Sequence, residues 1–263
     1  MQFRILGSVG AVVDGRFCSI PGARQRTLLA TLLIRAGRLV PTEHLYTELW
    51  GDRPPATVEN SLQAHVCRLR RTLRKLGGPS HDVPPLITHA SGYVLDIAPE
   101  DVDLTLFRER IALSRNAMAD APEAAGALLE EALALWQGSP LQDVAPGPLC
   151  QSVSLQLEEE YLAALEDKLW LGTVCDEPTL VIGELKRMSV AHPWRERITE
   201  MLMLALYRSG RQAEAVAVYN TARGRLIDEL GMEPSPQLKR LFREVLNQAP
   251  GLYRPTQQLL RSA

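Results

Sequence analysis

The sequence predicts an α+β domain at the front of the chain and an all-α domain behind it. Three observations predict this division. Short β-like stretches separated by glycines open the chain, helical apolar periodicity dominates from Val102 onward, and the charge balance changes sign between the two parts. Up to Ile97 there are 12 Lys and Arg against 7 Asp and Glu, and after it 17 against 24. A basic front and an acidic back indicate two domains with different partners.

The front of the chain predicts strands, then helices, then a closing hairpin. Strands are expected at 3–7, 11–15 and 17–20, with Asp14-Gly15 as a hairpin turn. Apolar periodicity predicts helices over 23–36, 43–50 and 57–76. Two short strands are expected within 86–97, around a turn in which Gly92 takes a positive φ. This order of elements is that of a winged-helix domain of the OmpR type, which we place at 1–97.

The back of the chain predicts antiparallel pairs of helices joined by short connections that carry Gly or Pro. The pair over 194–229 resembles a tetratricopeptide unit, with Leu202 and Leu206 on its first helix and Ala215, Tyr219 and Ala222 on its second, where the small alanines would allow the two helices to approach closely. Generic packing of a helical hairpin is the alternative. We place a TPR-like helical domain at 98–250 and a flexible C-terminal tail at 251–263. The helices are expected over 104–118, 122–136, 151–171, 178–189, 194–209, 212–229 and 235–247.

The helix over 57–76 has two contrasting faces at 100° per residue. One narrow sector is apolar and is expected to pack on the rest of its domain. The opposite side is small and polar near its N-terminus and cationic toward its C-terminus. The apolar sector consists of Val58, Leu62, Val66, Leu69, Leu73 and Leu76.

The gradient along the polar face predicts a helix that enters the major groove of double-stranded DNA. Small residues allow close approach to base edges in the first turns, and Asn or Gln can bond adenine there, whereas Arg and Lys meet phosphates in later turns. The alternative is an amphipathic helix whose charged face only meets water. Residues assigned to bases are Thr57, Asn60, Gln63 and Ala64; Arg68 is assigned to guanine or phosphate; and Arg71, Arg74 and Lys75 are assigned to phosphate.

Further DNA contacts are predicted outside this helix. His89 and Ser91 lie at or near the tip of the closing hairpin, which would be the wing against the adjacent minor groove or phosphates. Thr42 is the expected N-cap of the second helix, and its hydroxyl and the nearby amides would face a phosphate. Arg24 and Arg26 begin the first helix, where they would meet either the DNA backbone or solvent.

Several classes of protein and site are not supported by the sequence. It contains no GxxxxGK[ST], GxGxxG, HExxH or GxSxG motif and no Cys/His spacing typical of a metal site. It has no apolar run long enough for a membrane span and no secretion signal at its N-terminus. We therefore expect a cytoplasmic protein with reduced thiols that is not an enzyme and has no cofactor, metal or membrane partner.

The motifs together resemble a known family. LWGDRPP, NSLQAHVCRLRRTLRKL, SGYVLDI and VDLTLF in the front part are similar to the Streptomyces antibiotic regulatory proteins. LWQGSPL, LEEEYLAALE, ERITEMLMLALYRSGRQAEAVAVY and LIDELGMEPSPQL extend the similarity to the back part, so it spans nearly the whole chain. Members of this family join an OmpR-type winged helix to a bacterial transcriptional activation domain.

The resemblance implies a pathway-specific transcriptional activator of secondary-metabolite (antibiotic) biosynthesis genes that acts at the nucleoid. Its implied partners are direct repeats in double-stranded DNA, RNA polymerase through the sigma factor and the alpha subunit, and further copies of itself on the DNA. OmpR-type wings often carry arginines where this chain has His89 and Val94, so the long helix would carry more of the recognition. The alternative function is a helical-repeat scaffold for protein interactions without specific DNA binding.

Overall fold

The structure is a computed structural model that describes residues 1–78, 83–145, 147–175 and 178–253. From residue 254 onward, the predicted flexible tail lies outside the described residues. By their internal contacts the residues form two compact units. The first combines 1–113 with 130–162, and the second combines 114–129 with the chain from 163 onward.

The first unit opens with the predicted antiparallel sheet. Strand β1 (Gln2–Arg4) pairs with β2 (Gly10–Val13), which pairs with β3 (Arg16–Ser19). Asp14 and Gly15 have φ values of 51° and 73°, as a tight hairpin turn of this kind requires. Phe3 and Ala11 in this sheet and Ile5 directly after β1 are fully buried, so the sheet contributes directly to the core.

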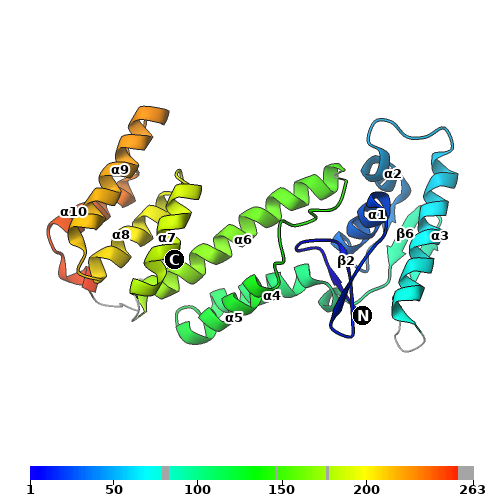
Figure 1. Ribbon diagram of the computed structural model, residues 1–263, viewed down its shortest axis with the longest axis horizontal. Coiled ribbons are helices and arrows are strands. Elements are labelled where there is room, and N and C mark those ends of the chain that lie inside the picture. Colours follow the sequence, from blue (N-terminus) through cyan, green and yellow to red (C-terminus); the bar gives the residue numbers. More distant parts are fainter. Residues whose placement is uncertain (79–82, 146, 176–177, 254–263) are drawn as a thin grey trace. The chain divides into compact units, whose positions relative to one another are not determined.

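Three helices follow, close to their predicted bounds. Helix α1 (Ala23–Ile34) is almost entirely buried through its leucines, and the hydroxyls of its buried Thr27 and Thr31 are satisfied by carbonyls one turn earlier. Helix α2 (Thr42–Trp50) and helix α3 (Val58–Gly77) pack on α1. In Figure 1, α1 and β6 lie beside one face of α3, and the opposite face points away from them.

The predicted closing hairpin is present and belongs to a second small sheet. Strands β5 (Leu86–His89) and β6 (Gly92–Leu95) pair with each other, and the two-residue strand β4 (Val40–Pro41) pairs with the other edge of β6. Sequence patterns did not predict β4, because a strand of two residues has no periodicity. The order of strands, three helices and hairpin confirms the winged-helix prediction.

Gly92 does not have the predicted positive φ, so that expectation is wrong. The residue is needed for space instead. A Cβ atom at this position would collide with the carbonyl oxygen of Val40 on the paired strand β4. Glycine therefore allows β4 and β6 to come together.

The first unit extends past residue 97 because later segments attach to the N-terminal strands. The carboxylate of Asp103, at the start of α4 (Asp103–Ala117), accepts hydrogen bonds from the amides of Ile5 and Leu6, each at 3.0 Å. The amides of Gln137 and Leu141 donate to the carbonyls of Leu6 and Ile5 at 2.9 and 3.0 Å. The LWQGSPL segment thus makes main-chain contacts with the residues directly after β1.

Helices α5 (Pro122–Ala134) and α6 (Pro148–Val174) follow α4 along the chain, and part of each helix belongs to the first unit. Phe107, Trp136 and Tyr161 form an aromatic cluster in the first unit, with ring centroids 5.2 and 4.8 Å apart. Such contacts between aromatic rings add to the stabilisation that burial of their apolar surface provides.

The second unit is helical, as predicted. Helix α8 (Glu196–Arg208) is its centre, because residues 198, 199 and 201–207 are buried and α7 (Pro178–Ala191), α9 (Gln212–Leu230) and α10 (Pro236–Leu246) each pack on it. Ala215 and Tyr219 of α9 are buried, as the predicted packing of α9 against α8 requires. Ser235 caps α10 by accepting a hydrogen bond from the amide of Leu238 at 3.2 Å.

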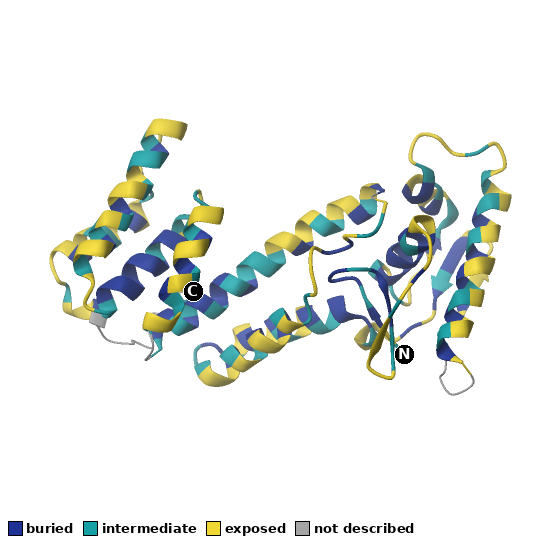
Figure 2. Ribbon diagram, in the orientation of Figure 1, coloured by how far each residue is buried: buried dark blue, intermediate teal, exposed yellow. Residues whose placement is uncertain are grey.

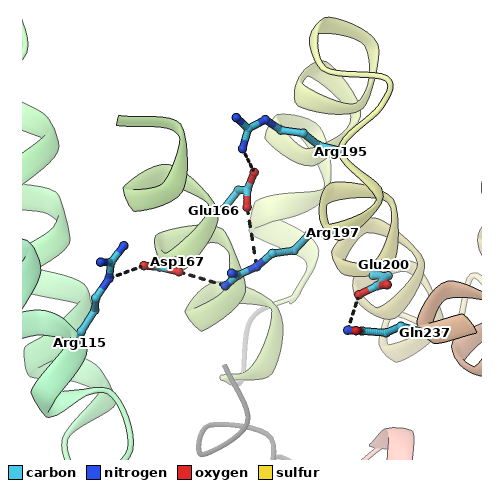
Figure 3. Close-up of polar contacts among 7 residues, drawn as sticks. All are labelled: Arg115, Glu166, Asp167, Arg195, Arg197, Glu200 and Gln237. Atoms are coloured by element: carbon cyan, nitrogen blue, oxygen red, sulfur yellow. Dashed lines mark hydrogen bonds and ion pairs between the residues drawn. The ribbon is translucent and has the colours of Figure 1, made fainter. Parts of the chain in front are cut away.

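A network of ion pairs ties α4, α6 and α8 together in the second unit (Figure 3). Buried Glu166 pairs with Arg195 at 3.0 Å and with Arg197 at 3.8 Å. Its neighbour Asp167 pairs with Arg197 at 3.0 Å and with Arg115 at 3.3 Å. Each carboxylate has arginine partners, so this cluster is structural.

Candidate nucleic-acid interface

Helix α3 has the two faces that its sequence predicts. Leu62, Val66, Leu69 and Leu73 are buried to 2% exposure or less, and they hold the helix against the rest of the unit. The opposite side is exposed along the whole helix, which is visible in Figure 2 as yellow on its outer side. All eight residues assigned to DNA on and beside this helix are exposed: Thr57, Asn60, Gln63, Ala64, Arg68, Arg71, Arg74 and Lys75.

The exposed face is long enough to follow a DNA groove. Fifteen residues separate Asn60 from Lys75, and a rise of about 1.5 Å per residue places them roughly 22 Å apart along the axis. This is about two-thirds of one turn of B-form DNA, which advances about 34 Å. The polar first turns and the basic last turns can therefore meet different parts of one groove.

The cations at the end of α3 have no carboxylate to neutralise them within the described residues. Arg71, Arg74 and Lys75 form no ion pair there, and the Nε of Arg68 makes only a 3.4 Å hydrogen bond to the carbonyl of Ala64 on the same helix. Uncompensated positive charge on one face produces a field that attracts a polyanion. The charge is also favourably placed for the helix dipole, since it lies toward the C-terminus of α3.

Arg70 has a different role from its neighbours on α3. Its guanidinium donates to the carbonyl of Leu86 at 2.9 Å and to the hydroxyl of Thr88 at 2.7 Å. Both acceptors belong to β5, so Arg70 holds the wing strand against α3. Nothing in the local sequence pattern predicts this role, because the partner lies 16 residues away.

The wing presents its tip to solvent. His89 and Ser91 are exposed, and His89 pairs with Gly92 across the turn. The carbonyl of Ser91 accepts two hydrogen bonds from Thr42, one from the amide at 3.0 Å and one from the hydroxyl at 3.2 Å. The wing tip is thus fixed to the start of α2.

The expectation that Thr42 is the N-cap of α2 is wrong. Pro41 holds the N-cap position, and Thr42 is the first residue of the helix. Both of its donors, the amide and the hydroxyl, are already used by Ser91, because the hairpin returns alongside β4. A phosphate binds through hydrogen-bond donors, so to bind Thr42 it would have to displace the carbonyl of Ser91.

Beside the first turns of α3 lies an open hollow of about 490 Å³. Arg24 from α1 and Arg53 from the loop after α2 join Arg68 around it, and packing of helices brings the three together from distant parts of the sequence. No local pattern could have predicted this group. The remaining lining residues are Trp50, Pro55, Asn60, Ser61, Ala64 and His65.

His65 on this hollow is a packing residue. Its Nδ1 lies 2.8 Å from the Nε2 of Gln25, and its ring packs edge-on to Trp50 with centroids 5.9 Å apart. Burial, with smaller effects from Arg68 and Arg24, lowers the pKa of His65 below its ordinary value. The ring therefore stays neutral at neutral pH and adds no charge to the face.

Arg26, the other arginine at the start of α1, points to a partner within the unit. Its Nε lies 3.2 Å from the carboxylate of Asp143 and donates to the carbonyl of that residue at 2.7 Å. A further bond reaches the carbonyl of Ile20 at 3.0 Å. Arg26 therefore holds the 137–145 segment in place. Because its guanidinium is bound within the unit, it fits neither of the two alternatives expected for it, which were contact with the DNA backbone and exposure to solvent.

Comparisons with known proteins agree with this architecture. Residues 21–95 match the family described as transcriptional regulatory protein, C terminal, and residues 102–246 match the bacterial transcriptional activator domain. The chain is 38% identical to the transcriptional regulator RedD of Streptomyces coelicolor, over 97% of this chain and 73% of RedD. The chain belongs to the Streptomyces antibiotic regulatory protein family.

Other members of the Streptomyces antibiotic regulatory protein family and its relatives differ in length. The regulatory protein AfsR of Streptomyces coelicolor is 37% identical over 96% of this chain, which covers only 25% of AfsR. The solved structure of Mycobacterium tuberculosis EmbR in complex with a low affinity phosphopeptide gives a TM-score of 0.89 at 29% identity. It matches 99% of this chain and 68% of the EmbR chain.

Membership of the Streptomyces antibiotic regulatory protein family makes the chain a transcriptional regulator and confirms that it is not an enzyme. The described residues contain no group of His, Cys, Asp and Glu suited to hold a metal ion. Within the same residues, no helix is both long and apolar enough to cross a bilayer.

Proposed function

We propose that this regulator binds double-stranded DNA through the exposed face of α3 and activates transcription of antibiotic biosynthesis genes. The observation that carries the proposal is the combination of exposed small polar residues at the start of the face with uncompensated cations at its end. A solvated surface helix more often carries its charges as pairs of opposite sign, which stabilise the helix. Here Arg71, Arg74 and Lys75 have no such partners among the described residues.

The roles along the face follow its gradient. Thr57, Asn60, Gln63 and Ala64 lie toward base edges, and Arg68 reaches guanine or phosphate. Arg71, Arg74 and Lys75 contact phosphates, where they contribute affinity rather than specificity. His89 and Ser91 at the wing tip make secondary contacts, and Thr42 contributes least because Ser91 occupies its donors.

The arrangement of copies on DNA and the link to polymerase complete the proposal. Tandem direct repeats require protomers in one orientation, and hence a head-to-tail contact rather than a two-fold one. The second unit offers helical surface for that self-association and for RNA polymerase, through its sigma factor and alpha subunit. The site of action would be the nucleoid.

The decisive experiment is a salt series of DNA binding, measured by fluorescence anisotropy with a labelled duplex. Each phosphate contact adds about 0.9 to the slope of log affinity against log salt. The Arg71→Ala with Arg74→Ala double variant should lower that slope by about 2 and weaken binding at every salt concentration. The matched control is Arg211→Ala with Arg223→Ala, which removes the same charge from exposed arginines of the second unit.

Two results would contradict the proposal. If the DNA affinity of the unaltered chain does not change with salt, the helical-repeat scaffold is favoured. If the α3 variant and the control variant give equal salt slopes, the exposed face of α3 does not bind DNA. Asn60→Ala separates base contact from phosphate contact, because it should reduce discrimination between target and random duplex and leave the slope unchanged.

A further inference from the structure

A second hollow in the first unit lies away from the exposed face of α3. It measures about 480 Å³ and is formed by the turn after α1, strand β4, helix α2 and the start of α6. Sites for small molecules commonly measure about 300–1,000 Å³. Its size therefore suits a small organic ligand rather than a macromolecule. The lining residues that matter here are Arg35, Arg38, Leu39, His44, Thr47 and Leu149.

The rim of this hollow is cationic. Arg35 and Arg38 belong to one turn, in which the amide of Arg38 donates to the carbonyl of Arg35 at 2.8 Å. Both side chains are exposed, and neither forms an ion pair with any described residue. His44 adds a third nitrogen donor from α2. Arginine is well suited to carboxylate and other oxyanions, because its planar guanidinium can donate two parallel hydrogen bonds.

The one acidic lining residue, Glu48, is committed to another partner. It is only 6% exposed, and its carboxylate accepts hydrogen bonds from the amides of Leu149 and Cys150, the latter at 3.3 Å. These amides are in the first turn of α6, where a carboxylate is favoured by the helix dipole. The charge of Glu48 is thus balanced by the helix end, and the two arginines determine the sign of the rim.

The walls of the hollow are apolar and held in place. Leu39 is 44% exposed although it is aliphatic, and Val40, Pro41, Pro148 and Leu149 continue the apolar surface. The amide of Gly37 donates to the carbonyl of Leu95 at 3.1 Å, and Val40 pairs with Tyr93 across β4 and β6. Main-chain bonds therefore fix one wall, and the site is formed without a ligand.

We propose that this hollow binds a small organic anion with an apolar ring system. The anionic group would meet Arg35 and Arg38 at the rim, and the ring would cover Leu39 and Leu149. A neutral apolar molecule would contact only the apolar walls, and an inorganic anion would contact only the cationic rim. The inference is independent of DNA binding, because none of these residues belongs to the exposed face of α3.

The test uses the full chain and two fluorescent probes that differ in charge. Anilinonaphthalene sulfonate is an aromatic anion whose emission rises in an apolar site, and phenylnaphthylamine is its neutral counterpart. The sulfonate should bind saturably and more tightly than the amine. Arg35→Gln with Arg38→Gln should weaken sulfonate binding about tenfold or more and leave the amine unaffected, because charge-assisted hydrogen bonds are lost.

Two further variants locate the bound probe. Thr47→Trp places a large side chain at the exposed rim and should weaken binding of both probes, whereas Arg211→Gln with Arg223→Gln, a matched loss of charge in the second unit, should change neither. The proposal is overturned if both probes bind equally well, if the Arg35 and Arg38 variant leaves sulfonate affinity unchanged, or if Thr47→Trp has no effect. Circular dichroism and urea denaturation of each variant verify that the chain is folded.

Discussion

The arginines of α3 and those around Glu166 and Asp167 have the same chemistry and opposite surroundings. In the second unit, Arg195 and Arg197 meet carboxylates that are 10% exposed or less, at distances near 3 Å (Figure 3). On α3, Arg71 and Arg74 face solvent without an acidic partner among the described residues. The first group holds helices together, and the second leaves its charge available to a partner outside the chain. What distinguishes the two groups is therefore the position of carboxylates.

The largest expected effect concerns the paired group. Glu166→Ala should lower the free energy of unfolding by about 2–3 kcal/mol, because it removes a buried carboxylate and leaves Arg195 without its partner. Urea denaturation measures this change. Glu158→Ala, on the exposed side of the same helix, is the control and should change stability by less than about 0.5 kcal/mol. Equal effects of the two substitutions would show that the ion-pair network is not structural.

The carboxylate of Asp103 should behave differently with pH, because burial rather than an opposite charge has the largest effect on its pKa. Burial raises the pKa of Asp103 to about 6, although the amides of Leu6 and Ile5 act in the opposite direction. The folded chain then binds more protons than the unfolded chain between about pH 4 and 6, so stability should fall as pH rises through that range. Between pH 4 and pH 7, the free energy of unfolding of the unaltered chain should fall by about 2 kcal/mol more than that of the Asp103→Asn variant.

Denaturation of both proteins at a series of pH values measures that difference. If the difference in unfolding free energy between the two proteins is the same at every pH, the prediction is wrong. The variant is expected to be less stable than the unaltered chain at low pH, because an amide side chain cannot accept all the hydrogen bonds that Asp103 accepts from the strand.

Single substitutions in each arginine group should separate binding from stability. Arg71→Ala should weaken DNA binding several-fold and leave the unfolding midpoint unchanged, since its side chain contacts no described residue by an ion pair. Arg197→Ala should lower the unfolding free energy by about 1 kcal/mol and leave the salt slope of DNA binding unchanged. Anisotropy and urea denaturation of both variants provide the measurements. If both variants lose stability to the same extent, the comparison between the groups fails.

The smallest effect is expected at an exposed ion pair. Hydrogen bonds from the exposed side chains of Arg211 and Lys186 lower the pKa of Glu214 to about 2. The depressed pKa contributes stability above the ordinary pKa of the group, and this is lost only as pH falls toward 2. Glu214→Gln should leave the thermal midpoint at neutral pH almost unchanged, because solvent screens exposed pairs. A large fall would mean that the exposed pairs of the second unit are structural too.

The sequence predicted the helices and the orientation of α3 well, since these depend on local periodicity. The apolar stripe of Leu62, Val66, Leu69 and Leu73 identified the buried face because four leucine and valine positions repeat at helical spacing. The cap of α2 was mispredicted, because a Thr after Pro resembles an N-cap and the competing acceptor, Ser91, lies 49 residues away. The roles of Arg26 and Arg70 depend on partners 117 and 16 residues away, Asp143 and Leu86, which no local pattern encodes.

The bonds from Asp103 and from residues 137 and 141 to Ile5 and Leu6, directly after β1, have a practical consequence for engineering. A fragment cut at residue 97 would lose the acceptor for the amides of Ile5 and Leu6 and would uncover one edge of its own sheet. Chimeras that exchange recognition helices between relatives should therefore be spliced within the α1–β6 segment, and any minimal fragment should retain the chain to residue 162.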